Sequence, residues 1–413
     1  MSGPWFVLLE SNTTGTGRDF ADAARRHGLR PVLLARTPAR YPYAAELDLD
    51  VRELDTGCAA AVAAACRELR PAGLAGVTSS SEYFMHTAAA VAAELGLPAP
   101  DPAAVARCRD KATQRRWLAE RAVPVPDFAV CRTRARAHDA ARAIAAPVVV
   151  KPVAGTGSLG VRACADPDTA ADWAEHLLAD GPADDTVLVE REISGPEYSA
   201  EVLDGEVVGL TAKHLGPRPY FVETGHDFPA PVSARVAAGL GAVARDAVHA
   251  LGLVTGPAHV ELRLSDRGDP YLVEVNPRLA GGLIPRLVRH ATGRDLVGEV
   301  VAGLSGRPVR PVRTGGRHAS IRFLVPSRSG VVREVTGLDP ARAVPGVVEL
   351  SCAVTAGMPI RVENSFRDRR GHVIAVSDTA ETAGKLADRA VARIVIAYAE
   401  PGSDRRVDHR TTQ

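Results

Sequence analysis

Residues 258–276, AHVELRLSDRGDPYLVEVN, carry the most specific pattern in this chain of 413 residues. Polar and apolar residues alternate at both ends of the stretch, and the turn-forming residues SDRGDP lie between them, so the pattern predicts a β-hairpin. A period of two places three residues of each strand on one face: His259, Glu261 and Arg263 on the first strand, and Leu272, Glu274 and Asn276 on the second.

The hairpin brings together the side chains of Glu261, Glu274 and Asn276. Two carboxylates and an amide are oxygen ligands for a hard cation, and Mg²⁺ is typically held by one or two carboxylates together with nucleotide phosphates. Arg278 adds a positive charge to the same edge. A solvated hairpin with surface charges would explain VELRL alone about equally well, but it does not explain the whole combination.

A second motif, VVVKPVAGTGSLGV at residues 148–161, places a lysine before three glycines. The order excludes a P-loop, in which the lysine follows the glycines, and a lone G-x-G-x-x-G is weak evidence. Only four of the 50 basic residues are lysine, so each lysine is informative where arginine cannot replace a compact ammonium: Lys111, Lys151, Lys213 and Lys385. We therefore predict a phosphate site with Lys151 on a strand that leads into the glycine loop.

The composition is that of an ordinary soluble globular protein, with 46% hydrophobic residues and a net charge of +1. Neither nucleic acid nor a membrane surface is expected as a partner. No run of about 18 apolar residues occurs, and the N-terminus lacks the features of a signal peptide. Six scattered cysteines favour a reduced, cytoplasmic protein whose cysteines are mostly buried.

The order of expected elements predicts α/β and α+β parts and two to three domains. The predicted domains are residues 1–98, built on a small parallel sheet, 99–308 and 309–400, with a disordered tail at 401–413. The predicted helices are 18–27, 57–70, 82–95, 102–122, 167–179, 231–251 and 379–398. The predicted strands outside the hairpin include 5–10, 30–36, 74–80, 127–131 and 147–151.

In their order along residues 100–300, these motifs resemble the ATP-grasp superfamily of carboxylate–amine ligases. The resemblance implies an ATP-grasp fold, in which two α+β lobes clasp ATP, preceded by a Rossmann-like domain and followed by a small mixed domain. It implies the nucleotide-binding residues Lys111, Lys151, Gly155, Thr156, Gly157, Ser158, Glu190, Ile193, Glu197 and Lys213. The 13-residue and two-residue gaps match metal ligands at Glu261, Glu274 and Asn276, and Arg278 resembles the arginine that steadies the transferred phosphoryl group.

Within the superfamily, the chain most resembles the L-amino-acid ligases that make dipeptides and related amides. The segment 212–229, with Glu223 and His226, resembles the part of those enzymes that lies over the amino-acid site. Glu82 resembles a substrate-side glutamate. Simpler roles are also open: a helix N-terminal carboxylate for Glu82, a turn histidine for His226 and a surface position for Lys213.

Gly281 and Gly282 stand where some relatives have a bulky aromatic residue, which allows a roomier site for the amine substrate. The resemblance implies a ligase that uses ATP and Mg²⁺, with two ions and Mn²⁺ as an alternative, to join a small carboxylate to an amine, and it allows a homodimer. The implied catalytic residues are Arg278, Lys151, Glu223 and His226. The base is left open between Glu223, His226 and a phosphate oxygen.

Three other functions remain on the same fold: a carboxylase, a purine-pathway ligase and an acid–thiol ligase. A fourth alternative is a non-catalytic module that only binds ATP. The complete set of expected metal and phosphate ligands argues against the fourth.

Overall fold

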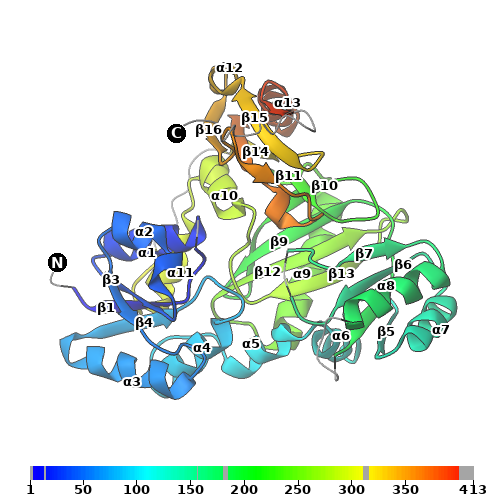
Figure 1. Ribbon diagram of the computed structural model, residues 1–413. Coiled ribbons are helices and arrows are strands. Elements are labelled where there is room, and N and C mark those ends of the chain that lie inside the picture. The colour runs from blue at the N-terminus through cyan, green and yellow to red at the C-terminus, as the bar shows by residue number, and fades with distance from the viewer. Residues whose placement is uncertain (1–2, 14, 156, 180–184, 310–315, 400–413) are drawn as a thin grey trace, which may run out of the picture.

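The structure is a computed structural model that describes residues 3–13, 15–155, 157–179, 185–309 and 316–399. Thr156 and the predicted tail at 401–413 lie outside these residues. A small parallel sheet stands at one end of the molecule and an α+β lobe at the other, with a large antiparallel sheet between them (Figure 1). The predicted mixture of α/β and α+β parts is therefore confirmed.

The N-terminal part is a four-stranded parallel sheet in the order β3-β2-β1-β4. Its strands are β1 (Trp5–Leu9), β2 (Arg30–Ala35), β3 (Asp50–Glu53) and β4 (Leu74–Thr78). Its helices are α1 (Thr16–Arg26), η1 (Pro38–Arg40), α2 (Pro42–Glu46), α3 (Ala59–Leu69), η2 (Arg70–Ala72) and α4 (Met85–Glu94). The predicted parallel sheet is present. Its edge strand β3 was not predicted, because three of its four residues are charged.

The helix predicted over 102–122 is two helices, α5 (Pro102–Arg109) and α6 (Lys111–Ala119). Asp110 between them has an extended backbone, and its side chain accepts a hydrogen bond from the Thr113 amide at 2.5 Å, so it caps α6. The break places Lys111 at the first position of α6, where its amide donates to the Val153 carbonyl at 2.9 Å. The capping aspartate therefore brings Lys111 to the glycine loop.

The smaller lobe is a four-stranded antiparallel sheet in the order β5-β8-β6-β7, covered by two helices. Its elements are β5 (Phe128–Cys131), α7 (Arg134–Ile144), β6 (Val148–Pro152), β7 (Arg162–Cys164), α8 (Pro167–Ala179) and β8 (Val187–Arg191). The sheet places Lys151 on β6 directly beside β8, because Lys151 pairs with Leu188 and Val149 with Glu190.

The large sheet has eight antiparallel strands in the order β13-β12-β9-β10-β11-β14-β18-β16. These are β9 (Glu197–Leu203), β10 (Glu206–Leu215), β11 (Glu223–Phe228), β12 (Pro257–Leu264), β13 (Pro270–Asn276), β14 (His318–Phe323), β16 (Val347–Cys352) and β18 (Gly371–Ser377). Helix α9 (Ala234–Leu251) packs against one end of the sheet. The sheet continues across the predicted boundary at residue 308, because β11 pairs with β14.

The predicted hairpin is β12–β13, but its register contains a bulge. Glu261 pairs with Glu274, whereas Leu262 pairs with Leu272, so Val273 is the extra residue. Leu272 is fully buried in the apolar cluster beneath the sheet. The expectation that Leu272 shares a face with Glu274 is therefore wrong, because the bulge turns β13 over between these two residues.

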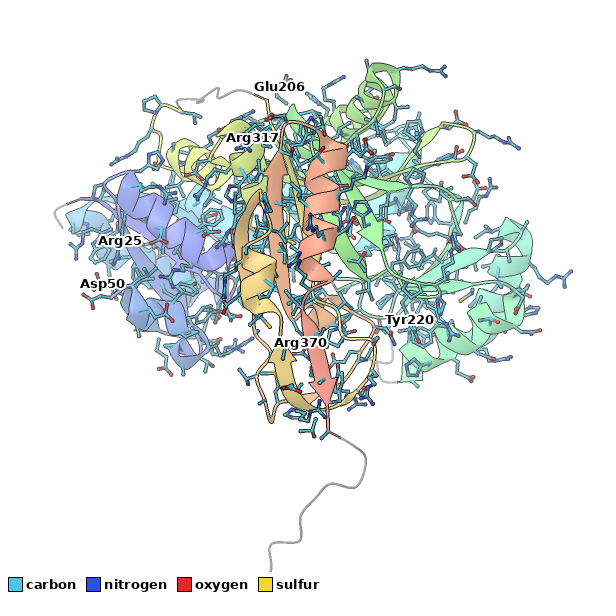
Figure 2. All side chains as sticks on the ribbon, turned by 90° about the horizontal axis from the view of Figure 1, so that it is seen from above. Arg25, Asp50, Glu206, Tyr220, Arg317 and Arg370 are labelled. Carbon is cyan, nitrogen blue, oxygen red and sulfur yellow. The ribbon has the colours of Figure 1, made fainter. Side chains whose placement is uncertain are left out.

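The remaining C-terminal elements cover the top of the molecule, between the N-terminal sheet and the smaller lobe (Figure 2). They are β15 (Gly330–Thr336), α12 (Leu338–Arg342), β17 (Pro359–Ile360), η3 (Phe366–Asp368), α13 (Ala380–Val391) and β19 (Val395–Tyr398). The helix predicted over 379–398 ends at Val391, and the β-branched run that follows pairs with β15 instead.

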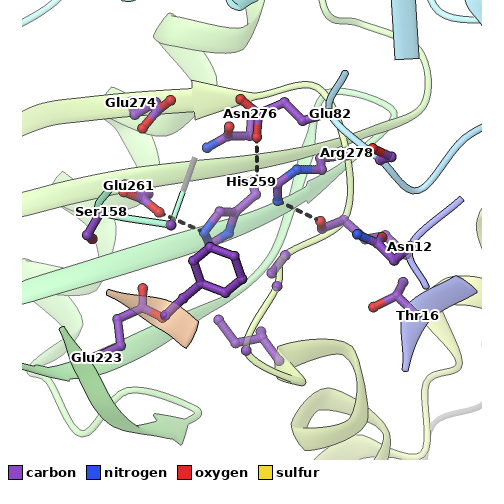
Figure 3. A pocket seen from close by; sticks show the side chains of 18 of the residues that line it. Asn12, Thr16, Glu82, Ser158, Glu223, His259, Glu261, Glu274, Asn276 and Arg278 are labelled. Carbon is purple, nitrogen blue, oxygen red and sulfur yellow. Dashed lines mark hydrogen bonds and ion pairs between the residues drawn. The ribbon is translucent and has the colours of Figure 1, made fainter. Parts of the chain in front are cut away.

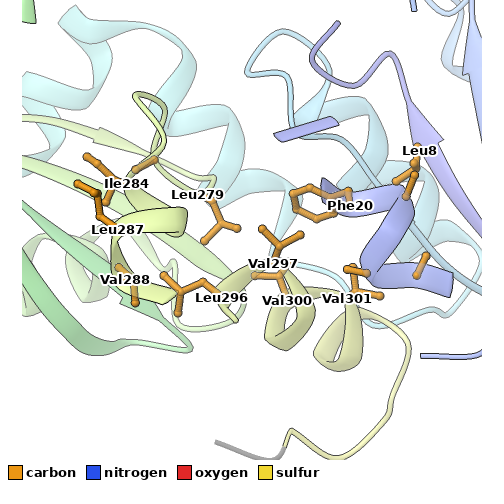
Figure 4. Close-up of a cluster of buried hydrophobic side chains, with 14 of the residues drawn as sticks. Leu8, Phe20, Leu279, Ile284, Leu287, Val288, Leu296, Val297, Val300 and Val301 are labelled. Atoms are coloured by element: carbon orange, nitrogen blue, oxygen red, sulfur yellow. The ribbon is translucent and has the colours of Figure 1, made fainter. Parts of the chain in front are cut away.

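Helices α10 (Ile284–Thr292) and α11 (Leu296–Leu304) join the parts of the molecule through one apolar cluster. Val297, Val300 and Val301 of α11 pack toward Phe20 of the N-terminal part, while Leu287 of α10 lies toward the large sheet (Figure 4). A segment from the middle of the chain therefore supplies a helix to the N-terminal sheet and fixes its position.

The described residues form no disulfide, and four of the six cysteines are buried, with Cys58 exposed and Cys352 half-buried. No helix within these residues is both long and apolar enough to cross a membrane.

Replacing Leu287 by alanine should test this shared cluster, because Leu287 is fully buried. We expect the free energy of unfolding to fall by about 2–5 kcal/mol, since the variant loses apolar contacts and leaves a cavity. Guanidinium denaturation measures the change. Val331→Ala, on an exposed position of β15, is the control and should change stability by less than about 0.5 kcal/mol; equal effects of the two variants would contradict the role of the cluster.

Candidate active site

A cavity of about 1210 Å³ lies where the N-terminal part, the two lobes and the C-terminal strands meet. Figure 3 shows Asn12 and Thr16 of the N-terminal part across this space from Glu261 and Glu274 of the hairpin. The predicted site residues that line it are Glu82, Lys111, Lys151, Gly155, Gly157, Ser158, Glu190, Ile193, Glu197, Lys213, Glu223, Glu261, Glu274, Asn276, Arg278, Gly281 and Gly282. The fold thus brings almost all of them to one place.

Lys111 links the hairpin to the glycine loop. Its Nζ lies 3.0 Å from Glu274 Oε1 and donates to the Gly155 carbonyl at 2.6 Å. Burial alone would lower the pKa of Lys111, but the charge of Glu274 outweighs it and raises the pKa above its ordinary value. Lys111 is therefore a permanent cation at the point where the loop meets the acidic strand.

Lys213 is the centre of a buried charge cluster. Its Nζ lies 2.7 Å from Glu223, 3.0 Å from Glu261 and 3.1 Å from Glu197. The side chain is 2% exposed, so the alternative of a surface position is wrong. Burial would lower the pKa of Lys213, but these three carboxylates raise it well above its ordinary value.

Lys151 and Arg115 share the buried carboxylate of Glu190. Lys151 Nζ lies 2.6 Å from Oε2, and Arg115 Nε donates to Oε1 at 2.5 Å. Burial would raise the pKa of Glu190, but the two cations hold it below its ordinary value. Burial also lowers the pKa of Lys151, and Arg115 contributes to that shift.

Arg115 also holds the hairpin strand at its bulge, because it donates to the carbonyls of Leu272 at 3.2 Å and Val273 at 2.7 Å. Gln114 continues this contact by exchanging two hydrogen bonds with the backbone of Val275. The sequence interpretation missed Arg115. Its spacing of four residues from Lys111, on one helical face, was the available signal.

Arg263 organises the opposite end of the cavity. Its Nε donates to Glu197 at 3.1 Å, and its Nη1 donates to the Ile193 carbonyl at 2.9 Å. Its guanidinium also lies over the ring of Phe221. Glu197 and Ile193, both expected at the nucleotide, are therefore fixed by one arginine of the hairpin.

A buried chain of polar groups supports Glu261 from behind. His259 lies 3.2 Å from Glu261 through Nε2 and 3.0 Å from Glu201 through Nδ1, and Ser199 donates to Glu201 at 2.9 Å. Burial would lower the pKa of His259, but Glu201 and Glu261 raise it to about 9. His259 thus supports Glu261 and is itself held by Glu201 of β9, which the sequence interpretation did not identify.

His226 lies behind the wall of the cavity and does not line it. It is fully buried, its Nε2 is 3.5 Å from Glu223, and its ring meets Phe323 edge-on. Burial lowers its pKa to about 3. The expectation that His226 contacts the substrate directly and acts as a base therefore does not agree with its position behind the cavity wall.

The two glycines that follow Arg278 differ in their surroundings. A Cβ at Gly282 would lie 2.5 Å from His226 Nε2, and the backbone there has a φ of +59°, so His226 excludes a side chain. A Cβ at Gly281 would meet nothing within 4 Å among the described residues. Arg278 itself donates to Glu82 at 2.8 Å. Gly281 alone therefore leaves open space beside Arg278.

The oxygen atoms of Glu261, Glu274 and Asn276 are of the kind that binds a hard divalent cation. No group of three or more His, Cys, Asp or Glu side chains with the geometry of a metal site occurs in the described ranges. Glu261 and Glu274 are directly paired across the hairpin, and Asn276 pairs with His259 two residues further along. Two carboxylates and an amide oxygen leave the remaining positions to phosphates and water, as Mg²⁺ requires.

Two family models match the chain: an ATP-grasp domain over residues 144–286 and the L-amino acid ligase C-terminal domain 2 over residues 322–399. The chain belongs to the ATP-grasp superfamily of carboxylate–amine ligases, in the group that carries the L-amino acid ligase C-terminal domain. Enzymes of this superfamily use ATP and Mg²⁺.

Three known proteins are similar to most or part of this chain. An uncharacterized protein of Sinorhizobium fredii (strain NBRC 101917 / NGR234) is 36% identical over 392 residues, covering 94% of this chain and 82% of that protein. Carnosine synthase 1 of Gallus gallus is 30% identical over 223 residues, covering 48% of this chain and 24% of that enzyme. The L-amino acid ligase of Bacillus licheniformis has the same fold, with a TM-score of 0.80, 22% identity, and coverage of 96% of this chain and 99% of that one.

Replacing Arg115 by methionine should leave Glu190 with Lys151 as its remaining cation. We expect a loss of about 3–5 kcal/mol of stability, because one partner of a buried pair is removed. The stabilisation by added ATP should also shrink, since Glu190 then retains Lys151. Denaturation with and without ATP measures both effects. Arg115→Lys should recover part of each, and the exposed Arg116→Met is the control; identical behaviour of the two methionine variants would exclude this role.

The low pKa of His226 predicts a contribution to acid sensitivity. The unfolded chain binds a proton near the ordinary pKa of 6.5, whereas the folded chain binds it only near 3. Stability should therefore fall as the pH drops through this window, by at most about 1.4 kcal/mol per pH unit from this group. His226→Gln should make the slope of unfolding free energy between pH 4 and 6 shallower, whereas the exposed His176→Gln should not. Equal slopes would contradict the assignment.

Proposed function

We propose that this chain uses ATP to activate the carboxylate of an amino acid as an acyl phosphate and then joins it to an amine. The products are an amide or peptide bond, ADP and phosphate. The observation that carries the proposal is the convergence, in one cavity, of phosphate-binding lysines, the acidic hairpin and the substrate-side carboxylates Glu82 and Glu223. The L-amino acid ligase C-terminal domain supports the choice of an amino acid.

The nucleotide would lie between the two lobes. Glu190 and Ile193 would face the adenine, and Glu197 would accept hydrogen bonds from the ribose. Lys111 and Lys151 would turn toward the phosphates, whose oxygens replace Glu274 and Glu190 as their anionic partners. Arg115 and Arg263 stay with Glu190 and Glu197, so these carboxylates remain paired after the lysines move.

Glu261, Glu274 and Asn276 would hold the metal, with two Mg²⁺ ions proposed and Mn²⁺ as an alternative. When bound there, the ions would neutralise phosphate charge during phosphoryl transfer. Lys213 is then required as well, because it lies against Glu261 and Glu223 and limits the repulsion between these carboxylates and the incoming phosphates.

In the first step, a carboxylate oxygen of the substrate attacks the γ-phosphorus and the bond to ADP breaks. Arg278 would stabilise the charge on the transferred group. In this structure the partner of Arg278 is Glu82. In the second step, the amine nitrogen attacks the acyl carbon, and the bond to phosphate breaks. Gly157 and Ser158 would exclude water from the acyl phosphate. Two hydrogen bonds hold them against the rest of the cavity wall: the Gly157 carbonyl accepts from the Phe366 amide, and the Ser158 hydroxyl donates to the Phe221 carbonyl.

The position of the groups favours a phosphate oxygen as the acceptor of the amine proton. Burial would raise the pKa of Glu223, but Lys213, His226 and Arg369 hold it well below its ordinary value. The pKa of His226 is also lowered, and this side chain is behind the wall. Neither group is therefore suited to the role of base, and the departing phosphate carries suitable oxygens.

A carboxylase, a purine-pathway ligase or an acid–thiol ligase would use the same fold. The experiment that separates them is incubation with ATP, Mg²⁺ and a panel of amino acids, singly and in pairs, with phosphate release and product mass as readouts. A new amide mass supports the proposal. ADP formation that depends on bicarbonate or on a thiol, without an amide, would contradict it, and binding without turnover would indicate a non-catalytic module.

Glu274→Gln removes one charge from the proposed metal site and the partner of Lys111. We expect phosphate release to fall by about 100-fold or more, because the charge acts on the phosphoryl group during transfer. Glu381→Gln, an identical change at an exposed helix position, is the control and should keep its activity. Full activity of Glu274→Gln would contradict the assignment of this residue as a ligand.

A further inference from the structure

The C-terminal part of the chain reaches the glycine loop through one well-fixed turn. In residues 363–369, the Asp368 carboxylate accepts hydrogen bonds from the amides of Glu363 and Ser365. Ser365 and Asp368 form a capping box around the short helix η3, and both side chains are almost fully buried. This arrangement fixes the backbone that carries Phe366, the first residue of η3.

Phe366 places its ring directly against Gly157. A Cβ added to Gly157 would lie 2.2 Å from Cδ1 of the ring, well inside the contact distance of two carbon atoms. The Phe366 amide also donates to the Gly157 carbonyl at 3.3 Å. Gly157 has a φ of +66° and opens the turn 157–160 between β6 and β7, which we call the glycine turn. The ring therefore occupies the space that a side chain at position 157 would need.

Other contacts hold the glycine turn from different directions. Trp173 of the smaller lobe donates through Nε1 to the Gly160 carbonyl at 2.9 Å. The Ser158 hydroxyl donates to the Phe221 carbonyl, which precedes β11, at 3.1 Å. Phe366 adds a contact from the C-terminal part of the chain, so the glycine turn is held by segments from three different parts of the sequence.

The turn that carries Phe366 is also anchored to the large sheet. Arg369, at its end, donates through Nη1 to Glu223 of β11 at 2.8 Å, and Glu223 is paired with Lys213 at 2.7 Å. Ser158 of the glycine turn and Glu223 border the same cavity (Figure 3). Residues 363–369 therefore bridge the smaller lobe and the large sheet at the wall of the cavity.

The place of the glycine turn bears on the fate of the acyl phosphate in the proposed reaction. This intermediate reacts with the amine or with water. In the reaction with water, the water oxygen bonds to the acyl carbon, the bond to phosphate breaks, the phosphate takes one proton, and the carboxylic acid is regenerated. Both reactions release one phosphate, but the second consumes ATP without forming an amide. A glycine turn displaced from the cavity would admit water to the intermediate.

We propose that Phe366 is a positioning residue that holds the glycine turn over the cavity and so keeps water from the acyl phosphate. The inference rests on the proposed ligase function and gives the C-terminal part of the chain a role in the same site. The ring sets the place of Gly157 by its shape, the backbone hydrogen bond fixes the Gly157 carbonyl, and the capping box keeps the ring where it is. Phe366 acts through Gly157 and not on the reacting atoms.

Two measurements on the full-length protein test this role, and the first needs no substrate. Hydrogen exchange is followed in the peptide over residues 157–164, in which the Val161 amide donates to the Ser158 carbonyl at 3.2 Å. Phe366→Ala should speed this exchange by about 10-fold or more, because the glycine turn loses the ring that packs against it. Phe366→Tyr keeps the ring and should exchange like the wild type. Val348→Ala, at an exposed position of the edge strand β16, is the control and should do the same.

The second measurement is the number of phosphates released for each amide formed, with the substrates that the amino-acid panel identifies. The wild type and Val348→Ala should release about one phosphate per amide, and Phe366→Ala at least about threefold more, since water then competes with the amine. Phe366→Tyr should recover the wild-type ratio, because the ring that contacts Gly157 is restored.

Gly157→Ala in two backgrounds tests the contact itself. Alanine at a φ of +66° is strained in either background, but in the wild type its Cβ also collides with the ring. Gly157→Ala should therefore speed exchange and raise the phosphate ratio less in the Phe366→Ala protein than in the wild type. Additive effects of the two substitutions would show that the ring does not define the place of Gly157.

The outcomes are distinct. Unchanged exchange in Phe366→Ala, or faster exchange with an unchanged phosphate ratio, would overturn the role of Phe366 while leaving the ligase activity intact. Phe366 is 37% exposed, so we expect the alanine variant to fold. If its melting temperature shows otherwise, Phe366→Leu takes its place and should change both readouts in the same direction. A wild type that forms no amide from any pair would contradict the proposed function, and hydrogen exchange would then decide alone whether Phe366 holds the glycine turn.

Discussion

The cavity depends on the pairing of buried carboxylates with cations. Glu190, Glu197, Glu223, Glu261 and Glu274 line it together with further carboxylates, and an unpaired charge in such a place would cost several kcal/mol. Lys213 forms ion pairs with three of them at once, while Arg115 pairs with Glu190 and Arg263 with Glu197. The two arginines also donate to backbone carbonyls, Arg115 to Val273 and Arg263 to Ile193. In the proposed function, Lys111 and Lys151 would exchange their carboxylate partners for nucleotide phosphates. Under that proposal, Arg115 and Arg263 would keep Glu190 and Glu197 paired while the nucleotide binds.

The sequence predicted those parts of the structure that depend on local pattern. The strand period predicted that Glu261 could reach Glu274 across the hairpin, and the structure pairs them directly. The strand that carries Lys151 was also predicted, because its pattern depends on neighbours in sequence. The face of Leu272 was wrong because Arg115, more than 150 residues earlier, holds the bulge that reverses it. Local periodicity contains no information about such a partner.

The substrate side was harder to predict for the same reason. His226 stands in the expected segment, but its burial follows from the approach of Gly282 and Phe323, which belong to other elements. Arg369 lines the cavity from the turn before β18 and donates to Glu223, a residue 146 positions earlier in the chain. The residue types were enough to predict ligands for phosphate and metal. The shape of the substrate pocket depends on contacts between segments that are distant in sequence.

The continuation of the sheet from β11 to β14 has a consequence for how this chain can be divided. If the chain ended near residue 308, β11 would become an edge strand with a row of unsatisfied backbone groups. Such edges pair with other chains and promote aggregation. The C-terminal part is therefore half of a common sheet and not a removable appendage, and relatives could exchange it only by preserving the hydrogen-bonding edge to which it is joined.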